Sequence, residues 1–286
     1  MGRREEAIKL LEEATSVAPT VWLNWMLLGS MLSNSERNEE ALQAYDCAAS
    51  CNDVNIAEVN YNQALVLKKL GKLTEALEIL PASRLLFDEA IHMHIQALRL
   101  ELLNQLGRHE EVLSASTAIE EFENDKHDAA DLGHYDIAVE ATQWAGTANT
   151  AIADAWVAVA TARRALQQDY SAVLSDVRRA FALHTSDEAL LLIRDVRNLH
   201  SPTAKAYKMT VTGQLMQDTE PRRGFFRNYL VLSDTPEEAL QFIGELEPET
   251  VTMDSCELSN DDQYVDVLTG TKGVYWVSRY FTFPEN

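Results

Sequence analysis

A local pattern recurs four times along the chain: a basic residue, two spacers, an acidic residue, a small or β-branched residue and a larger aliphatic residue. The small or β-branched positions are Ala7, Ala41, Ala76 and Val112, so successive copies are separated by 34, 35 and 36 residues. A period of about 34 residues is that of a solenoid of helix pairs, in which each pair packs on its neighbours. This part of the chain is therefore expected to be a row of stacked helix pairs.

The second copy carries further positions that belong to one kind of helix-pair repeat. Small residues at Gly29, Ala41 and Ala48 let two helix backbones approach closely, and the rings of Trp25 and Tyr45 fill the wedge between them. With these positions the copy resembles the tetratricopeptide repeat (TPR) family. The resemblance extends from residue 1 to about residue 122 and, more weakly, to residue 200.

Later copies depart from the repeat. Pro81 falls within the second helix of the third copy, and we expect it to kink that helix or end it early. Beyond residue 122 the sequence predicts a separate helix over Asp128–Ala145 and a helix pair over Ala153–Thr185. A closing helix is expected over Asp187–Leu199, with Ser186 as its N-cap. Residues 1–200 are thus predicted to form a TPR-like helical solenoid.

The start of the repeat array poses a packing problem. The helix expected over Arg4–Val17 is the second helix of a pair, and no first helix precedes it in the sequence. Ile8, Leu11 and Ala14 would then form an uncovered apolar face, whereas terminal repeats of solenoids need a polar outer face. We expect this face to be covered by a second copy of the chain or by residues that precede Met1 in a longer protein.

From about residue 203 the hydrophobic pattern changes from helical to alternating. A helix is expected after Asp234 or Thr235, one of which is its N-cap, with Pro236 in its first turn. The expected strands, of which the fourth has the weaker pattern, are Tyr207–Leu215, Phe225–Leu232, Val251–Leu258, Tyr264–Leu268 and Val274–Phe283. Residues 203–286 are therefore predicted to form a small α+β domain, an antiparallel sheet with one helix, in which we identify no family.

The predicted fold class is thus mainly α: a TPR-like helical solenoid followed by this small α+β domain. The connection between the two parts, at residues 200–203, is too short for a flexible tether, so they should touch. The aromatic residues of the last strand are expected to pack in the core. The alternative is that one of them lines a ligand or partner surface; the five aromatic residues are Tyr275, Trp276, Tyr280, Phe281 and Phe283.

The charge balance excludes one class of partner. The chain has 24 Lys and Arg residues against 45 Asp and Glu residues, a net charge of −21, and the acidic excess occurs both before and after residue 200. Such a chain repels phosphate backbones, so no nucleic-acid partner is expected. An acidic chain attracts basic proteins instead.

Other features of the sequence indicate the compartment. The three cysteines, Cys47, Cys51 and Cys256, do not suggest a disulfide framework and suit a reducing compartment. No signal peptide or membrane span is expected, because charged residues occupy the start and no apolar stretch is long enough. The sequence therefore favours a cytoplasmic protein without a membrane partner.

The sequence shows no set of residues with the spacing of an active site. Neither nucleotide-binding glycine motif is present. His92 and His94 are two residues apart on a predicted helix, so they point in different directions and do not form a metal pair. Cys47 and Cys51 lie on one helical face, but no second ligand pair accompanies them. We therefore expect no catalytic residues, no metal, no cofactor and no enzymatic activity.

The TPR resemblance implies where a partner would bind. In that family the first helix of each pair lines an inner groove, and an amide at the position of Asn62 spans the backbone of a bound peptide. We most expect a bound partner to contact Tyr61, Asn62 and Lys68 in this groove. The full predicted partner-binding set is Met26, Glu58, Tyr61, Asn62, Lys68, His94 and Glu101.

A subset of the family grips a terminal carboxylate with several basic and amide residues. The corresponding positions here hold mostly uncharged residues, and only one of the five fits: Met26, Ser30, Asn62, His94 and Leu98. We therefore do not expect that clamp.

The leading hypothesis is a non-enzymatic interaction module or scaffold that binds a basic protein or peptide in the solenoid groove. One alternative is an acidic neutralising protein, such as a bacterial immunity protein or antitoxin, whose charge mimics the substrate of a basic nuclease. Another alternative is an enzyme whose site lies in the C-terminal α+β domain.

Overall fold

The computed structural model describes residues 2–81, 89–131, 138–215, 223–247, 251–259, 270–278 and 281–284. The chain divides into two compact units, Met1–Arg108 and His109–Asn286. The boundary expected between residues 200 and 203 lies inside the second unit and, as a division between domains, stays a prediction. The predicted fold class is confirmed: the chain is mainly helical, and a small antiparallel sheet with one helix follows the helical part.

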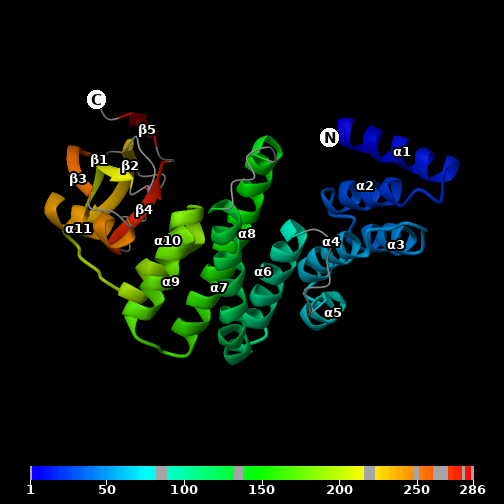
Figure 1. The fold of residues 1–286 in the computed structure, drawn as a ribbon, viewed down its shortest axis with the longest axis horizontal. Coiled ribbons are helices and arrows are strands. Elements are labelled where there is room, and N and C mark those ends of the chain that lie inside the picture. The colour runs from blue at the N-terminus through cyan, green and yellow to red at the C-terminus, as the bar shows by residue number, and fades with distance from the viewer. Residues whose placement is uncertain are drawn as a thin grey trace. The chain divides into compact units, whose positions relative to one another are not determined.

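The first unit is a succession of helices (Figure 1). Each of them contacts the next one along the chain, and α4 also contacts α2 and α6. Their bounds are Gly2–Val17 for α1, Trp22–Ser33 for α2, Asn38–Ala49 for α3, Ile56–Lys69 for α4, Leu73–Ile79 for α5 and Glu89–Gln105 for α6. The pairs α2–α3 and α4–α5 therefore correspond to the second and third copies of the repeat.

The close approach predicted from the small residues is confirmed in the second copy. Ala41 and Ala48 are fully buried, and the ring of Tyr45 lies directly against Gly29. A Cβ atom added at Gly29 would lie only 2.5 Å from that ring. The short helix α5 also behaves as predicted, because it ends at Ile79 and the chain is already extended at Leu80, before Pro81.

The expected uncovered face at the start of the chain is a wrong prediction. Ile8 is only 1% exposed and belongs to the same hydrophobic core as Leu28 and Leu32 of α2, and Leu11 packs against that core. The reason is that α2, the first helix of the following pair, covers α1. The argument for a second copy at Arg4–Val17 therefore loses its basis.

The second unit begins with four helices whose bounds are His109–Asp131 for α7, Ala138–Ala165 for α8, Tyr170–Leu183 for α9 and Asp187–Arg197 for α10. The separate helix expected over Asp128–Ala145 is a wrong prediction, because its described residues belong to the end of α7 and the start of α8; residues 132–137 lie outside the described part. No Gly or Pro interrupts residues 109–131, so α7 continues. The N-cap of α10 is confirmed, since Ser186 Oγ accepts a hydrogen bond from the Ala189 N–H at 3.1 Å.

The sheet and its helix follow. Neighbouring strands are antiparallel in the order β3-β1-β2-β4, and β5 also pairs with β2. The N-cap of α11 is Thr235, and Pro236 opens the helix as predicted. The bounds are Lys205–Leu215 for β1, Arg223–Ser233 for β2, Pro236–Leu246 for α11, Val251–Leu258 for β3, Gly273–Val277 for β4 and Phe281–Pro284 for β5.

The last strand differs from its prediction. Val274–Phe283 contains two strands, β4 and β5, which pair with different parts of β2. Between them the backbone N–H of Asn228 bonds to the hydroxyl of Ser278 at 3.0 Å, so a side chain replaces a ladder carbonyl and the pairing is interrupted. The strand expected over Tyr264–Leu268 lies outside the described residues.

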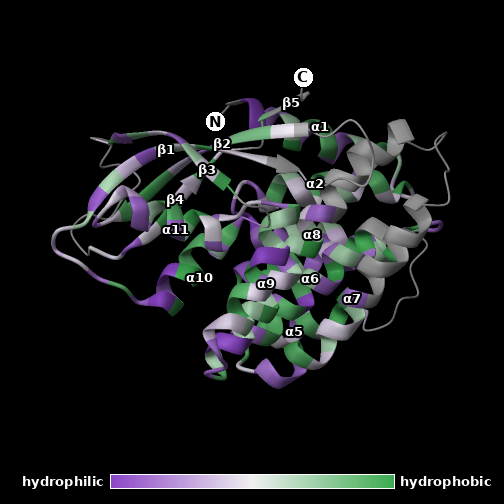
Figure 2. Cartoon of the chain, turned by 60° about the vertical axis from the view of Figure 1, so that its left-hand side comes forward, coloured by the Kyte–Doolittle hydropathy of each residue, from purple (hydrophilic) through white to green (hydrophobic). Residues whose placement is uncertain are grey.

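The helices and the sheet of the second unit share one core. Alternate residues of β1, namely Tyr207, Met209 and Val211, are buried against residues from α9, α10 and α11. In Figure 2 hydrophobic residues, in green, occur on the strands and on these helices. The prediction that the helical part and the sheet touch is thus confirmed.

A buried ion pair holds β2 against the end of α11. The side chains of Arg227 and Glu247 are 1% and 0% exposed, and the guanidinium donates to Glu247 Oε1 at 2.7 Å. Glu247 also accepts a hydrogen bond from the hydroxyl of Tyr229. The guanidinium lies 4.8 Å from the ring centre of Phe181 on α9, so the pair connects the sheet to the helices.

A second cluster fixes the connection between α10 and β1. Asp234 accepts hydrogen bonds from the hydroxyls of Ser201 at 2.5 Å and Thr203 at 2.8 Å, and from the Lys272 ammonium at 3.0 Å. These three donors, with Ser201 the strongest cause, lower the pKa of Asp234 to about 2. The carboxylate therefore contributes to stability only while it is ionised.

The contact of Gly29 with Tyr45 gives a first prediction. Gly29→Ala should lower the free energy of unfolding of the first unit by about 1–3 kcal/mol, because the new methyl group displaces a buried ring. Gly244 in α11 is the matched control: it has nothing within 4 Å of an added Cβ, so Gly244→Ala should raise stability by up to about 1 kcal/mol. Urea denaturation of both variants tests this, and equal effects would contradict the packing.

The buried ion pair gives a second prediction. Arg227→Met should lower the free energy of unfolding of the second unit by about 3–5 kcal/mol, because the buried carboxylate of Glu247 loses its ion-pair partner. The control is Arg164→Met, which removes a pair to Asp195 whose side chains are 48% and 43% exposed, and it should cost less than about 1 kcal/mol. Similar denaturation midpoints for the two variants would refute the assignment.

The Asp234 cluster gives a third prediction. Because its folded pKa is about 2, below the unfolded reference value of 3.8, the stability it contributes is present above the unfolded pKa and is lost as the pH falls through the folded pKa. Unfolding measured between about pH 5 and pH 2 should show the wild type more stable than Asp234→Asn at the upper end, with the difference shrinking toward pH 2. A difference that does not depend on pH would contradict the prediction.

Candidate functional site

The predicted partner-binding residues all lie on three helices of the first unit. Met26 is on α2, four further residues are on α4, and His94 and Glu101 are on α6. Because α4 contacts both α2 and α6, these first helices of successive pairs are neighbours. We name the surface formed by Leu23, Leu27, Glu58, Tyr61, Asn62, Lys68, His94 and Glu101 the α2–α4–α6 wall.

Four of the predicted residues meet in two contacts between α4 and α6. The rings of Tyr61 and His94 lie with their centres 6.0 Å apart at an angle of 51°. About two turns further along the same two helices, the ammonium of Lys68 pairs with the carboxylate of Glu101 at 2.5 Å. Both pairs join residues 33 positions apart, three fewer than the 36 residues that separate these two copies, so each contact joins residues about one helical turn out of register on neighbouring first helices.

Asn62 lies on the same wall and is half-buried. Its amide nitrogen donates a hydrogen bond to the backbone oxygen of Glu58, one turn earlier on α4, at 2.8 Å. The amide oxygen and the second N–H are left as an acceptor and a donor for a ligand. Glu58 itself is half-buried, and its backbone N–H is capped by Asn55 at 3.4 Å.

Met26 does not belong to the wall. Its side chain is 4% exposed and packs in the core of the first unit, so it offers little surface to a partner. The exposed apolar residues of α2 are Leu23 and Leu27, which are 48% and 49% exposed. They stand 35 positions before Glu58 and Asn62, and so take the equivalent places in the preceding copy. Leu27 was not in the predicted set, although its spacing of four from Leu23 is the signal for it.

The acidity of the first unit does not lie on this wall. The wall carries the charged residues Glu58, Glu101 and Lys68. Most of the exposed acidic residues of the first unit lie instead on the second helices α1, α3 and α5, and Glu36 and Asp53 lie in turns. Those on the helices are Glu5, Glu6, Glu12, Glu13, Glu39, Glu40, Asp46, Glu75 and Glu78.

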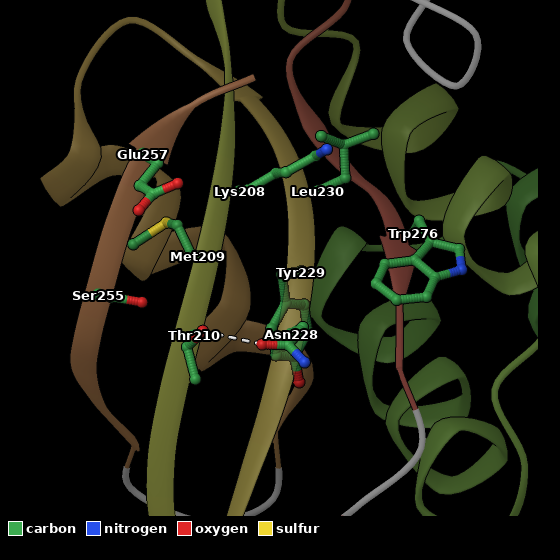
Figure 3. Close-up of a pocket in the computed structure, with 9 residues that line it drawn as sticks. All are labelled: Lys208, Met209, Thr210, Asn228, Tyr229, Leu230, Ser255, Glu257 and Trp276. Atoms are coloured by element: carbon green, nitrogen blue, oxygen red, sulfur yellow. Dashed lines mark hydrogen bonds between the residues drawn. The ribbon is translucent and has the colours of Figure 1, made fainter. Parts of the chain in front are cut away.

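A second candidate site lies on the C-terminal sheet. It is a pocket of about 490 Å³ whose lining residues are Lys208, Met209, Thr210, Asn228, Tyr229, Leu230, Ser255, Glu257 and Trp276 (Figure 3). Met209 and Tyr229 are 1% exposed, and their side chains belong to the core that α11 covers. Because successive side chains of a strand point to opposite faces, the pocket opens on the face away from α11.

The strand register assembles this pocket from distant parts of the chain. Glu257, Lys208, Leu230 and Trp276 stand opposite one another across β3, β1, β2 and β4. A second row places Ser255 beside Thr210 and Asn228, whose side chains share a hydrogen bond of 2.8 Å. Trp276 was considered as a ligand residue from the sequence, but its neighbours were missed because no local pattern encodes the register.

The lining of the pocket combines an ammonium, a carboxylate, an amide, hydroxyl groups and an indole. Its lining includes no histidine or cysteine, and the hydroxyl of Ser255 bonds to no base within the described residues. Nor does the described part of the chain contain a group of three or more residues that could hold a metal ion.

Among the helices that the structure describes, none is both long and apolar enough to cross a membrane.

Comparison with known proteins gives a partial match. No protein-family profile matches the chain. The chain is similar to a peroxisomal targeting signal receptor of Candida glabrata, with 29% identity over 105 residues. The match covers 37% of this chain and 18% of that receptor, so the chain spans less than a fifth of the receptor's length. A match of this extent supports TPR-like repeats in the chain.

Proposed function

We propose that this protein is a non-enzymatic interaction scaffold that binds a segment of a partner protein on the α2–α4–α6 wall. The observation that carries the proposal is the pairing of Tyr61 with His94 and of Lys68 with Glu101 across neighbouring helices. These contacts hold partly exposed polar and aromatic side chains in fixed positions on rigid elements, as recognition of a peptide requires. The similarity to a targeting signal receptor supports the same class of function.

The chemistry of the wall defines what it would bind. Leu23 and Leu27 offer exposed apolar surface on α2, while Asn62 offers an amide donor and acceptor on α4. A peptide that places an aliphatic side chain on the two leucines would bring its backbone to Asn62, because these positions are equivalent in adjacent copies. We propose an extended or helical segment with apolar anchors as the ligand.

We propose a basic partner because of the acidic residues that lie outside the wall. The wall itself carries charges of both signs, whereas exposed acids cover α1, α3 and α5 and the whole chain has a net charge of −21. Such a field increases the rate at which a basic partner arrives more than it strengthens the final contact.

The three cysteines are free thiols, which supports placing the binding of this partner in the cytoplasm.

A peptide selection on the full-length protein tests the proposal. Selected peptides should bind the Tyr61→Ala and Asn62→Ala variants at least about tenfold more weakly, since each loses one contact group. Gln63→Ala is the matched control, because Gln63 is the adjacent amide but bonds to Asp46 of α3 at 2.7 Å. Its affinity should not change. Fluorescence anisotropy gives the dissociation constants.

Two results would count against the proposal. If the selected peptides bind Asn62→Ala as tightly as wild type, the wall is not the site. If the association rate of basic peptides does not fall between about 50 and 500 mM salt, the electrostatic part is wrong even when the wall is confirmed.

A further inference from the structure

The pocket lies on the outer face of the C-terminal sheet. The strands that form its floor cannot pair with an additional strand. Its central strands, β1 and β2, are each paired on both sides, β1 with β3 and β2, and β2 with β1 and with β4 and β5. Their backbone groups are therefore used within the sheet. An extended peptide gains affinity mainly by pairing with an open strand edge, so a ligand that lies over β1 and β2 is recognised there by side chains.

Those side chains have unused hydrogen-bonding capacity. Within the described residues, no hydrogen bond engages the amide nitrogen of Asn228, the hydroxyl of Ser255, the carboxylate of Glu257 or the indole N–H of Trp276. Asn228 Oδ1 already accepts from the hydroxyl of Thr210 at 2.8 Å, which fixes the amide so that its two N–H groups face outward as donors. Donors and acceptors thus alternate over one small surface, and a ligand hydroxyl can satisfy either kind.

The same surface has an apolar side. Trp276 is 43% exposed, and Leu230 lies beside it in the floor, 4% exposed. Figure 3 shows the indole ring at one end of the pocket and Glu257 and Ser255 at the other. A ligand that fits must therefore have one face without polar groups, to stack on the indole, and a rim that carries hydroxyl groups.

The charges of the lining disfavour an ionic ligand. Lys208 and Glu257 are its charged residues, they face each other across β1 and β3, and their charges sum to zero. An anion would meet the carboxylate and a cation would meet the ammonium. A neutral ligand avoids both penalties.

We propose that this pocket binds a neutral saccharide of about one or two rings, a size in keeping with its volume of about 490 Å³. The carbon–hydrogen face of one ring stacks on Trp276 and covers Leu230. Ring hydroxyls accept from the amide of Asn228 and donate to the carboxylate of Glu257. This site is separate from the α2–α4–α6 wall and does not depend on the function proposed for it.

The test is a titration of the full-length protein with cellobiose, maltose and N,N′-diacetylchitobiose, followed by the NMR signal of the Trp276 indole N–H and by calorimetry. We expect at least one of these probes to reach saturation below about 20 mM. Trp276→Ala should weaken that binding at least about tenfold. Asn228→Asp should do the same, because it keeps the oxygen that accepts from Thr210 but removes both N–H donors.

Matched controls separate the site from general effects. Trp22→Ala removes a half-buried indole from α2 and should leave saccharide affinity unchanged. Circular dichroism and thermal unfolding confirm that each variant folds. The proposal is overturned if none of the three probes saturates, or if binding persists unchanged in Trp276→Ala. It is also overturned if a neutral acetylated and amidated tripeptide binds at Trp276 in place of the saccharides, since the face would then be a peptide site.

Discussion

The buried pair of Arg227 and Glu247 determines how the second unit is put together. A guanidinium and a carboxylate that are 1% and 0% exposed are stable in a core only when each is fully paired, and here Tyr229 and Phe181 complete their surroundings. The pair fixes which face of β2 points toward α9 and α11. Because side chains alternate along a strand, it also turns Asn228 and Leu230 to the outer face, where they form the pocket.

In the first unit, the corresponding constraint is the size of a few side chains. The absence of a side chain at Gly29 lets the ring of Tyr45 lie against the backbone of α2, and buried alanines on α3 keep the two helices of the pair close. Repetition of this packing places α2, α4 and α6 as neighbours. The contacts of Tyr61 with His94 and of Lys68 with Glu101 follow from that repetition, although neither pair is adjacent in sequence.

The two candidate sites differ in how far the sequence could predict them. The wall follows from a repeated position, so Tyr61, Asn62 and Lys68 could be named from the resemblance alone. The burial of Met26 was not predicted, because a period gives the helical position but not how deeply the neighbouring helices bury it. The break between β4 and β5 was not predicted, because it depends on a hydrogen bond between Asn228 and Ser278, which are 50 residues apart.

By itself the sequence determined the elements that depend on local chemistry: the period of the helix pairs, the end of α5 before Pro81, the cap Ser186, the start of α11 at Pro236, and the alternation of β1. Only the tertiary structure decided which surfaces meet. In the structure Ile8 packs against α2, and most exposed acidic residues of the first unit lie outside the wall. The strand register places Glu257, Lys208, Leu230 and Trp276 opposite one another across four strands. The physical reason is that caps and periodicity act within a few residues, whereas burial and strand register are set by contacts between distant segments.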